Sequence, residues 1–569
     1  MNKRTVNNRT SHPNAQHTVK RLMLIGLGLL LCICTYAQFC INGIEPCFDQ
    51  RTRSFLVSIP KSYWGRDFQA TITLSKNSAW KQLTVNNQSI AQPVVFQLIQ
   101  GNKSYPISVE VDGKINHYTL SFTFLPILHL SGDFNTNYSF GVVELMDQLQ
   151  ATQVMNAEIK WRGGSTNGPT KHKRNYKIKF IDEQGEKKNY SFFLLRKDNN
   201  WILDAGQVDM FRLRNLIAGK IWNDFATKPY YSVVESDVYT ASRGEVVELF
   251  LNDRYDGIYN FCEPIDRKQL KLRKYNETSL QIHGGLWKAT GWGYATFWNN
   301  PKQYDNSLPT WDVFELKYPK LDEVCPSDYS TLYNAIKFVY SSSPSEFSDH
   351  IAEYIDIPVF IDYYLFLNVL NAFDISAKNV YWAVYDKQNH KTITPALWDM
   401  DCTVGQNYTN NPLHPDYVAW NANPFVPTYI GTRLLELNTD NFKNKLTNRY
   451  IQLRKGVFSY NNLANIYRHY YDLIHDSGAT TREEERWSGD SDISFLTLNF
   501  EEELYYILDW LKHRLDFLDQ YFADQYEMGI YASINDKCTI NDKYTISGIK
   551  VDGLYKGITI IEGKKYLMK

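Results

Sequence analysis

The side chains best suited to chemistry are acids and an amide in two short segments. Asp374 and Asn379 are separated by four residues, and Asp399 and Asp401 follow further along the chain. Carboxylate and amide oxygens are the ligands that hard cations such as Mg²⁺ prefer. Phosphoryl transfer needs a carboxylate to orient the attacking hydroxyl, and an Asn and an Asp to hold Mg²⁺ on the phosphates. The order of these residues therefore predicts phosphoryl-transfer chemistry.

The flanking sequence predicts the elements that must position these residues. An apolar helix expected at 361–370 ends shortly before Asp374, and a strand is expected at 380–385. A second strand would carry Asp399 and Asp401 on one face, because alternate residues of a strand point the same way. Two carboxylates on one face suit a hard metal ion. The simple alternative is an acidic turn at the end of a strand.

Two lysines upstream also share a predicted strand face. In the segment 174–180, apolar side chains alternate with Lys177 and Lys179, so both ammonium groups point the same way. A glycine-rich turn that begins at Arg162 offers backbone N–H donors that could contact phosphates. Each signal is weak alone, since solvent-facing lysines and glycine turns are common.

A β-hairpin is predicted at 246–262, with Glu263 at its exit. A carboxylate there could hold a lysine of a neighbouring strand in position. The alternative is a solvated strand end with no functional partner.

Composition narrows the class of protein. The chain has 569 residues, of which 43% are hydrophobic and 22% charged, as in ordinary globular proteins. Lys and Arg number 61 against 62 Asp and Glu, so no overall basic field exists to attract nucleic acid. The 14 Trp, 40 Tyr and 30 Phe could form a sugar-binding surface, but they are more typical of β-rich cores.

The N-terminus has the pattern of a secretory signal peptide. Lys20 and Arg21 precede an apolar run at 22–34, and cleavage is expected near Ala37-Gln38. The run is shorter than the roughly 20 residues that a membrane span needs, and no later segment is apolar for that length. We therefore expect a mature chain without a transmembrane span that is secreted, periplasmic or on the cell surface.

The cysteines leave two further interpretations open. Lipidation would require a small residue before Cys32 or Cys34, but both follow large apolar residues. In an oxidising compartment, Cys40 and Cys47 could close a small loop, whereas the later cysteines are expected as single buried thiols.

The predicted fold class is α+β, with strands first and helices later. Short alternating strands, expected at 54–59, 69–74, 106–111 and 118–124, predict a small β-sandwich that acts as a spacer or binds a glycan or surface partner. The last long helix, expected at 500–522, has one apolar face for packing. The tail resembles the terminal hairpin of C-terminal tails on secreted Bacteroidetes proteins. The expected divisions are a signal peptide at 1–37, a β-sandwich at 38–130, the main domain at 131–525 and a β-rich tail at 526–569.

Taken in order, several segments of the main domain resemble the CotH kinase family, a family widespread among secreted bacterial proteins. The resemblance covers roughly the middle two-thirds of the chain. It rests on the segments 162–165, 174–180, 201–205, 212–215, 251–259, 373–379 and 398–401.

This resemblance implies an atypical protein-kinase-like domain, here preceded by the β-sandwich and followed by the short hairpin tail. Such a domain would transfer the γ-phosphate of ATP to Ser or Thr hydroxyls of exported or surface proteins, with Mg²⁺ or Mn²⁺ as cofactor. The family likeness makes Asp374 the catalytic residue. It makes Asn379 and Asp399 metal ligands, supported by Asp401.

The same resemblance assigns the nucleotide-binding residues. Lys177 would bind the ATP phosphates and pair with Glu263, and Arg162 would belong to the phosphate-binding turn. Lys179 lies on the same strand face, so it is the alternative phosphate-binding lysine.

Two other functions remain open. A secreted kinase must find ATP outside the cytoplasm, where none is made, so the domain could instead be a catalytically weak scaffold that binds glycans or a surface partner. A glycosidase would need only two carboxylates about 5–10 Å apart. That hypothesis leaves Asn379 and the lysine-bearing strand unexplained.

Overall fold

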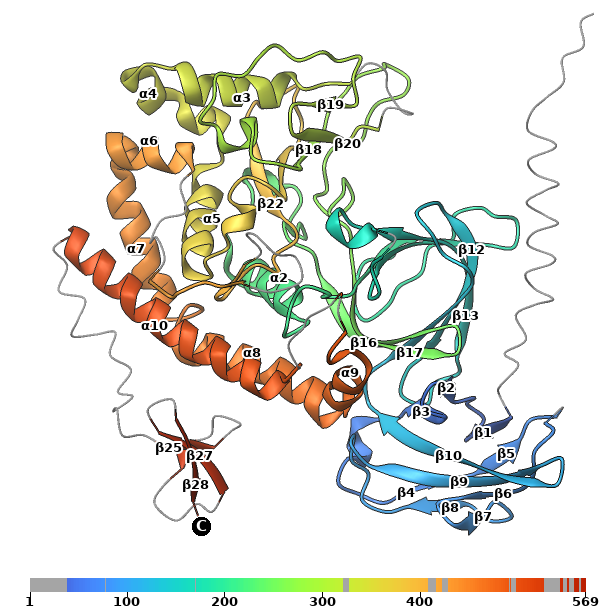
Figure 1. Ribbon diagram of the computed structural model, residues 1–569. Helices are drawn as coiled ribbons and strands as arrows, with labels where there is room; N and C mark the ends of the chain where they lie inside the picture. Colours follow the sequence, from blue (N-terminus) through green and yellow to red (C-terminus); the bar gives the residue numbers. More distant parts are fainter. Residues whose placement is uncertain are drawn as a thin grey trace, which may run out of the picture. The chain divides into compact units, whose positions relative to one another are not determined.

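The computed structural model (Figure 1) divides into two compact units. Unit 1 comprises residues up to Asp204, Val246–Tyr259 and Asp476–Arg486, and unit 2 comprises the remainder. The predicted signal peptide lies outside the described residues. None of the helices among the described residues has the length and apolar character needed to cross a membrane. The structure describes residues 38–76, 78–168, 170–320, 327–407, 416–421, 428–490, 492, 498–526, 543–545, 550–551, 557–561 and 564–568.

The N-terminal part of unit 1 contains one large sheet and two small ones. The small sheets pair β1 (Phe39–Ile41) with β5 (Ile72–Leu74), and β4 (Phe68–Ala70) with β8 (Val94–Phe96). Aromatic rings from different sheets pack together. The ring centroid of Phe122 lies 5.6 Å from that of Phe68 and 5.0 Å from that of Phe96. The large sheet has the order β2 (Cys47–Asp49), β3 (Ser54–Ser58), β10 (Lys114–Thr123), β9 (Ser104–Val111), β6 (Lys81–Val85) and β7 (Gln88–Ser89).

One predicted strand of this region, 69–74, is interrupted. Its two halves belong to β4 and β5, which lie in different sheets. At the break, the N–H of Thr71 donates to Oδ1 of Asn42 instead of to a neighbouring strand. Alternation of apolar residues predicts extended backbone, but it cannot show where a chain changes its pairing partner.

The rest of unit 1 is built on a closed β-barrel, which the sequence did not predict. Its strands run in the order β11 (Ile127–Ser131), β12 (Ser139–Met146), β13 (Gln153–Arg162), β14 (Asn175–Ile181), β15 (Asn200–Asp204), β17 (Arg254–Cys262) and β16 (Gly244–Leu251). The predicted hairpin at 246–262 is confirmed as β16 and β17, and the predicted lysine strand is β14. A short helix, α9 (Ala479–Trp487), follows much later in the sequence.

Unit 2 has a five-stranded antiparallel sheet and most of the helices, which confirms the α+β class. The sheet has the order β19 (Thr310–Trp311), β20 (Phe314–Tyr318), β18 (Gly285–Ala289), β21 (Val380–Val384) and β22 (Thr394–Leu397). The helices are α2 (Arg214–Phe225), α3 (Ser330–Ser341), α4 (Pro344–Tyr354), α5 (Ile357–Val369), α6 (Tyr429–Leu437), α7 (Phe442–Arg454), α8 (Tyr460–Asp476) and α10 (Phe500–Tyr526).

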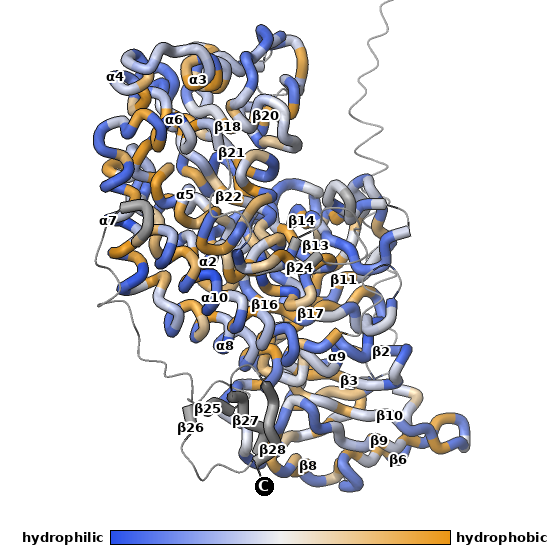
Figure 2. Tube along the Cα trace, turned by 60° about the vertical axis from the view of Figure 1, so that its left-hand side comes forward, coloured by the Kyte–Doolittle hydropathy of each residue, from blue (hydrophilic) through white to orange (hydrophobic). Residues whose placement is uncertain are grey.

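Helix α5 is the centre of unit 2. Every residue from Val359 to Val369 is buried, and the helix contacts β22, α7 and α10 (Figure 2). A helix that is apolar all round must be buried on all sides, so its position follows from its sequence. Its C-terminus leads directly into the segment that carries Asp374.

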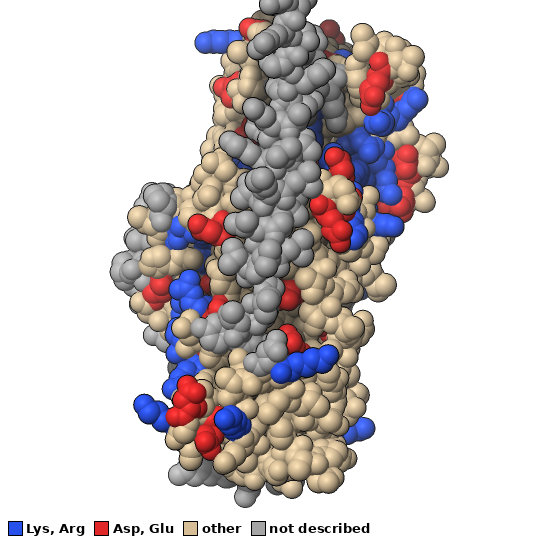
Figure 3. All heavy atoms as spheres, turned by 90° about the vertical axis from the view of Figure 1, so that its right-hand side faces the viewer, with Lys and Arg blue, Asp and Glu red and all other residues tan. Residues whose placement is uncertain are grey.

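The predicted strand after that segment is confirmed as β21, and the predicted final helix as α10. In the tail, β27 (Gly557–Ile561) and β28 (Lys564–Met568) form the predicted terminal hairpin. Acidic and basic side chains are interspersed on the face shown in Figure 3, in keeping with the net charge of -1.

Candidate functional site

The first half of the site is the short segment between α5 and β21. A single 3-10 turn, Phe373–Ile375, holds Asp374, and Asn379 ends the segment with a left-handed backbone, φ 64°. Asparagine adopts this conformation more readily than most residues. The N–H of Asn379 donates to the carbonyl of Ala289 at the end of β18, at 2.9 Å. The segment is thus fixed at both ends by regular structure.

Within this segment, Asp374 and Asn379 contact each other directly. Nδ2 of Asn379 donates to Oδ2 of Asp374 at 2.6 Å, and Nζ of Lys378 lies 3.7 Å from Oδ1. Because a carboxylate only accepts, the amide nitrogen must face Asp374, and the amide oxygen faces elsewhere. The Asp374 side chain is 23% exposed. A carboxylate held at one oxygen and partly open to solvent can accept a proton from an incoming hydroxyl.

The second half of the site is the segment from Trp398 to Gln406, called the acidic loop below. The prediction that Asp399 and Asp401 lie on a strand is wrong, because β22 ends at Leu397 and Asp399 has φ 66°. A left-handed residue cannot continue an extended strand. The two carboxylates are still partly exposed, whereas Trp398 and the intervening Met400 are buried.

Electrostatics shows that the two halves meet. Burial raises the pKa of Asp374, the positive charge of Lys378 opposes this, and the negative charge of Asp399 raises it further. Burial also raises the pKa of the Cys402 thiol, as do the charges of Asp401, Asp374 and Asp399. The structure therefore brings together the predicted catalytic and metal-binding residues of the sequence analysis.

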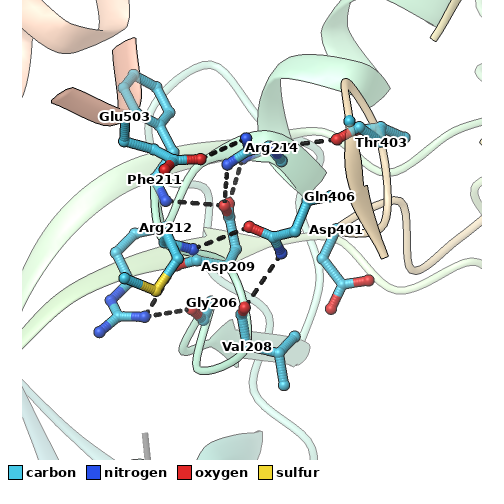
Figure 4. A network of polar contacts seen from close by, with 12 residues as sticks. Gly206, Val208, Asp209, Phe211, Arg212, Arg214, Asp401, Thr403, Gln406 and Glu503 are labelled. Carbon is cyan, nitrogen blue, oxygen red and sulfur yellow. Dashed lines mark hydrogen bonds and ion pairs between the residues drawn. The ribbon is translucent and has the colours of Figure 1, made fainter. Parts of the chain in front are cut away.

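A buried ion-pair cluster lies behind the acidic loop (Figure 4). Arg214, at the start of α2, pairs with Asp209 at 2.7 Å and with Glu503 of α10 at 2.5 Å. All three side chains are almost completely inaccessible to solvent. Burial alone would lower the pKa of Arg214, but the charges of Glu503 and Asp209 raise it.

The acidic side chains of the site and Asn379 offer oxygen ligands to a metal ion. Among the described residues, no group of three or more His, Cys, Asp or Glu side chains is arranged to hold a metal. Mg²⁺ bound with a nucleotide needs fewer protein ligands, since one or two carboxylates suffice when phosphates and water complete its shell. The carboxylate of Asp399 forms no hydrogen bond or ion pair with any described residue. Asp399, Asp401 and the amide oxygen of Asn379 thus fit a hard divalent cation.

The predicted phosphate-binding residues lie in the barrel of unit 1. Lys177 lies on β14 opposite Lys160, and Nζ of Lys179 lies 4.0 Å from the ring centroid of Tyr138. Arg162 ends β13, directly before a turn in which Gly163 has φ 119°. These positions agree with the predicted strand and turn. Phosphate binding by these residues stays a prediction.

Glu263 belongs to unit 2 and has a well-defined partner there. Its buried carboxylate accepts two hydrogen bonds from Arg243, at 2.8 and 3.0 Å. The pairing of Glu263 with Lys177 stays a prediction.

Sequence analysis missed a buried ion pair in unit 1. Nζ of Lys173, just before β14, lies 3.0 Å from Oε2 of Glu483 on α9, and neither side chain is exposed. A Cβ atom at Gly257 of β17 would lie 1.9 Å from the same oxygen, so only glycine fits there. The sequence pattern placed Gly257 in the predicted hairpin, but no nearby residue indicated that Glu483, far along the chain, would lie against it.

The two thiols that could close a loop, Cys40 and Cys47, form no disulfide bond. Both line one cavity of about 330 Å³, and Cys262 and Cys402, which are also outside any disulfide, are buried. The possible loop closure between Cys40 and Cys47 is therefore not formed.

Comparison with known proteins decides the family. The model for CotH kinase protein matches residues 159–518. The chain belongs to the CotH kinase family. The matched range runs from β13 to α10, so it contains the predicted site residues Asp374, Asn379, Asp399 and Asp401. No curated protein matches the chain.

Proposed function

We propose that this CotH kinase family protein is a secreted protein kinase that transfers the γ-phosphate of ATP to Ser or Thr hydroxyls of exported or surface proteins. The observation that carries the proposal is the gathering of Asp374, Asn379, Asp399 and Asp401 at one place within the matched range. This set combines a candidate base with oxygen ligands for a cation, which is what phosphoryl transfer requires.

Asp374 orients the acceptor hydroxyl and accepts its proton. Its raised pKa brings the carboxylate closer to the working pH, which suits a general base. The hydrogen bond from Asn379 at 2.6 Å fixes one carboxylate oxygen, so the other oxygen is left to face the hydroxyl. Lys378 lies near that second oxygen and would also be close to a phosphate transferred there.

Asp399, Asp401 and Asn379 would hold Mg²⁺ or Mn²⁺. When bound, the cation supplies positive charge that neutralises the phosphate oxygens during transfer. Without it, the three carboxylates of the site repel one another and would repel ATP as well. These side chains therefore make nucleotide binding depend on the metal.

Lys177, with Arg162 and Glu263, completes the proposal as the ATP-binding set. Lysine and arginine are the usual phosphate partners, and a buried glutamate can hold a cationic side chain in place. Lys179 has its ammonium group over the ring of Tyr138 and stays the alternative phosphate-binding lysine.

One observation favours a second candidate, a kinase-like scaffold that binds a glycan or surface partner. The rings of Trp292 and Phe373 lie 4.8 Å apart and are 37% and 40% exposed. Exposed aromatic faces bind sugars and apolar side chains in many proteins. Phe373 directly precedes Asp374, so such a surface would also be compatible with a kinase.

The test is transfer of label from γ-labelled ATP, with Mg²⁺ or Mn²⁺, to the protein itself and to co-purified exported proteins. Wild type should transfer label only with a divalent cation, and Asp374→Ala should not transfer it. No label, together with no metal-dependent ATP binding by calorimetry, would reject the kinase and favour the scaffold.

A further inference from the structure

The first residues of α2 hold the backbone of the acidic loop. Oδ1 of Asn215 accepts a hydrogen bond from the N–H of Met400 at 3.0 Å. Nε of the adjacent Arg214 donates to the carbonyl of Thr403 at 3.1 Å. Met400 lies between Asp399 and Asp401 in the sequence, so the contact from Asn215 falls midway between the two candidate metal ligands.

The Met400 peptide is also held from its other side. Oγ1 of Thr403 donates to the carbonyl of Met400 at 3.0 Å, and the N–H of Thr403 donates to the carbonyl of Asp401 at 3.0 Å. Thr403 is completely buried, so water does not compete for these bonds. Both backbone polar groups of Met400 are therefore fixed by side chains, one from α2 and one from the loop.

The anchor on α2 is itself rigid. The guanidinium of Arg214 has ion-pair partners on both sides, Asp209 and Glu503, and none of the three can turn without losing a buried charge pair (Figure 4). A further bond joins the end of the acidic loop to the segment before α2, since Nε2 of Gln406 donates to the carbonyl of Val208 at 3.1 Å. The loop thus rests on a scaffold that is fixed independently of any ligand.

We propose that Asn215 and Thr403, the latter held by Arg214, are positioning residues that set the separation of the Asp399 and Asp401 carboxylates for a divalent cation. This inference rests on the proposed function. Two carboxylates on an irregular loop would otherwise move apart by repulsion, whereas a metal site needs its ligands held within about 0.5 Å of their working positions. The buried pairs around Arg214 supply that restraint without touching the cation.

The test measures Mn²⁺ affinity of the full chain by calorimetry, in the absence of nucleotide. Asn215→Leu removes the acceptor for Met400, and Thr403→Val removes the hydroxyl while keeping the shape of the side chain. Each should weaken Mn²⁺ binding by about tenfold or more, as loss of supporting contacts does at other metal sites. Thr403→Ser, which keeps the hydroxyl, should restore affinity to within about threefold of wild type.

Two controls separate the possible failures. Thermal unfolding of each variant, with titrations performed well below its midpoint, ensures that only folded protein is compared. Asp399→Asn should abolish Mn²⁺ binding. If Asp399→Asn binds Mn²⁺ like wild type, the metal assignment of the proposed function and this inference both fail. If Asp399→Asn loses binding while Asn215→Leu and Thr403→Val keep wild-type affinity, the positioning role alone is overturned.

Discussion

Around Arg214 each buried charge faces an opposite charge, whereas around Asp374 three carboxylates gather and the cation of Lys378 lies 3.7 Å away. Both clusters belong to unit 2, and the acidic loop connects them. In the first cluster the ion pairs stabilise the fold. In the second, three carboxylates lie near one lysine, and this excess of negative charge works against folding, which is typical of functional sites. Close ion pairing thus separates residues that hold the structure from residues that act.

The largest effect is expected at Asp374, in the rate of label transfer. Asp374→Asn keeps the size of the side chain but removes the proton acceptor, so label transfer should fall at least about a thousandfold. The pKa of Asp374 is raised in the folded protein, so a proton binds more tightly there than in the unfolded chain. At neutral pH the charged group therefore opposes folding, and Asp374→Asn should raise the unfolding midpoint by about 1–3 °C. An unfolding midpoint of Asp374→Asn below that of wild type would contradict the contrast drawn between the two clusters.

The cluster of ion pairs around Arg214 should respond in the opposite direction. Arg214→Met leaves Asp209 and Glu503 buried without their cation, which should reduce the free energy of unfolding by about 3–5 kcal/mol. Urea denaturation would measure the change. Lys378→Met is a matched control at a side chain that is 42% exposed, and its effect on unfolding should stay within about 0.5 kcal/mol. Equal changes in the free energy of unfolding for Arg214→Met and Lys378→Met would show that the buried ion pairs contribute no more to stability than the exposed Lys378.

Another buried acid, Asp356, tests through pH whether a carboxylate with a raised pKa opposes folding. Burial raises the pKa of Asp356 to about 6, although the N–H of Tyr230 donates to its Oδ2 at 2.9 Å. Because the folded pKa is raised, the stabilising effect of protonation is complete below about pH 4 and is lost as pH rises through about 6.

The stability of wild type relative to Asp356→Asn should therefore fall between pH 4 and pH 7, by about 2–3 kcal/mol. Urea denaturation at several pH values would measure it. A difference that does not change with pH would show that Asp356 does not titrate in this range.

The smallest effect is expected at Asp399 in the absence of metal. Asp399→Asn reduces repulsion with Asp374 and removes no hydrogen bond or ion pair to the described residues, so it should stabilise the apo protein by less than about 1 kcal/mol. Chemical denaturation in a chelating buffer would detect the sign. Destabilisation by more than about 1 kcal/mol would mean that Asp399 has a structural role.

Local patterns predicted the parts of the site that depend on neighbouring residues. The apolar run that becomes α5, the strand β21 and the spacing of Asp374 and Asn379 are all visible within a short window. The conformation of the acidic loop could not be predicted in this way. The alternation of apolar and acidic residues at 398–401 fits a strand, and nothing in it indicates the left-handed backbone of Asp399. An aspartate tolerates both conformations, so the choice is made by packing.

Contacts between distant parts of the chain could not be predicted at all. Glu503 is 289 residues from Arg214, and Glu483 is 310 residues from Lys173. No periodicity or spacing relates such residues, and each alone is typical of an exposed helix or strand end. Closure of the barrel could not be predicted for the same reason, because β16 pairs with β11, which lies about 120 residues earlier in the chain.

The most direct test of the account is the shift in thermal unfolding that Mg²⁺ and ATP produce together. If the unbalanced carboxylates form a metal-dependent nucleotide site, wild type should gain about 2.7 kcal/mol when the complex is present at a hundredfold excess over its dissociation constant. ATP with chelator should give no shift, and Asp399→Asn should give none with either. An equal shift in wild type and Asp399→Asn, or no shift in wild type at millimolar MgATP, would contradict the account.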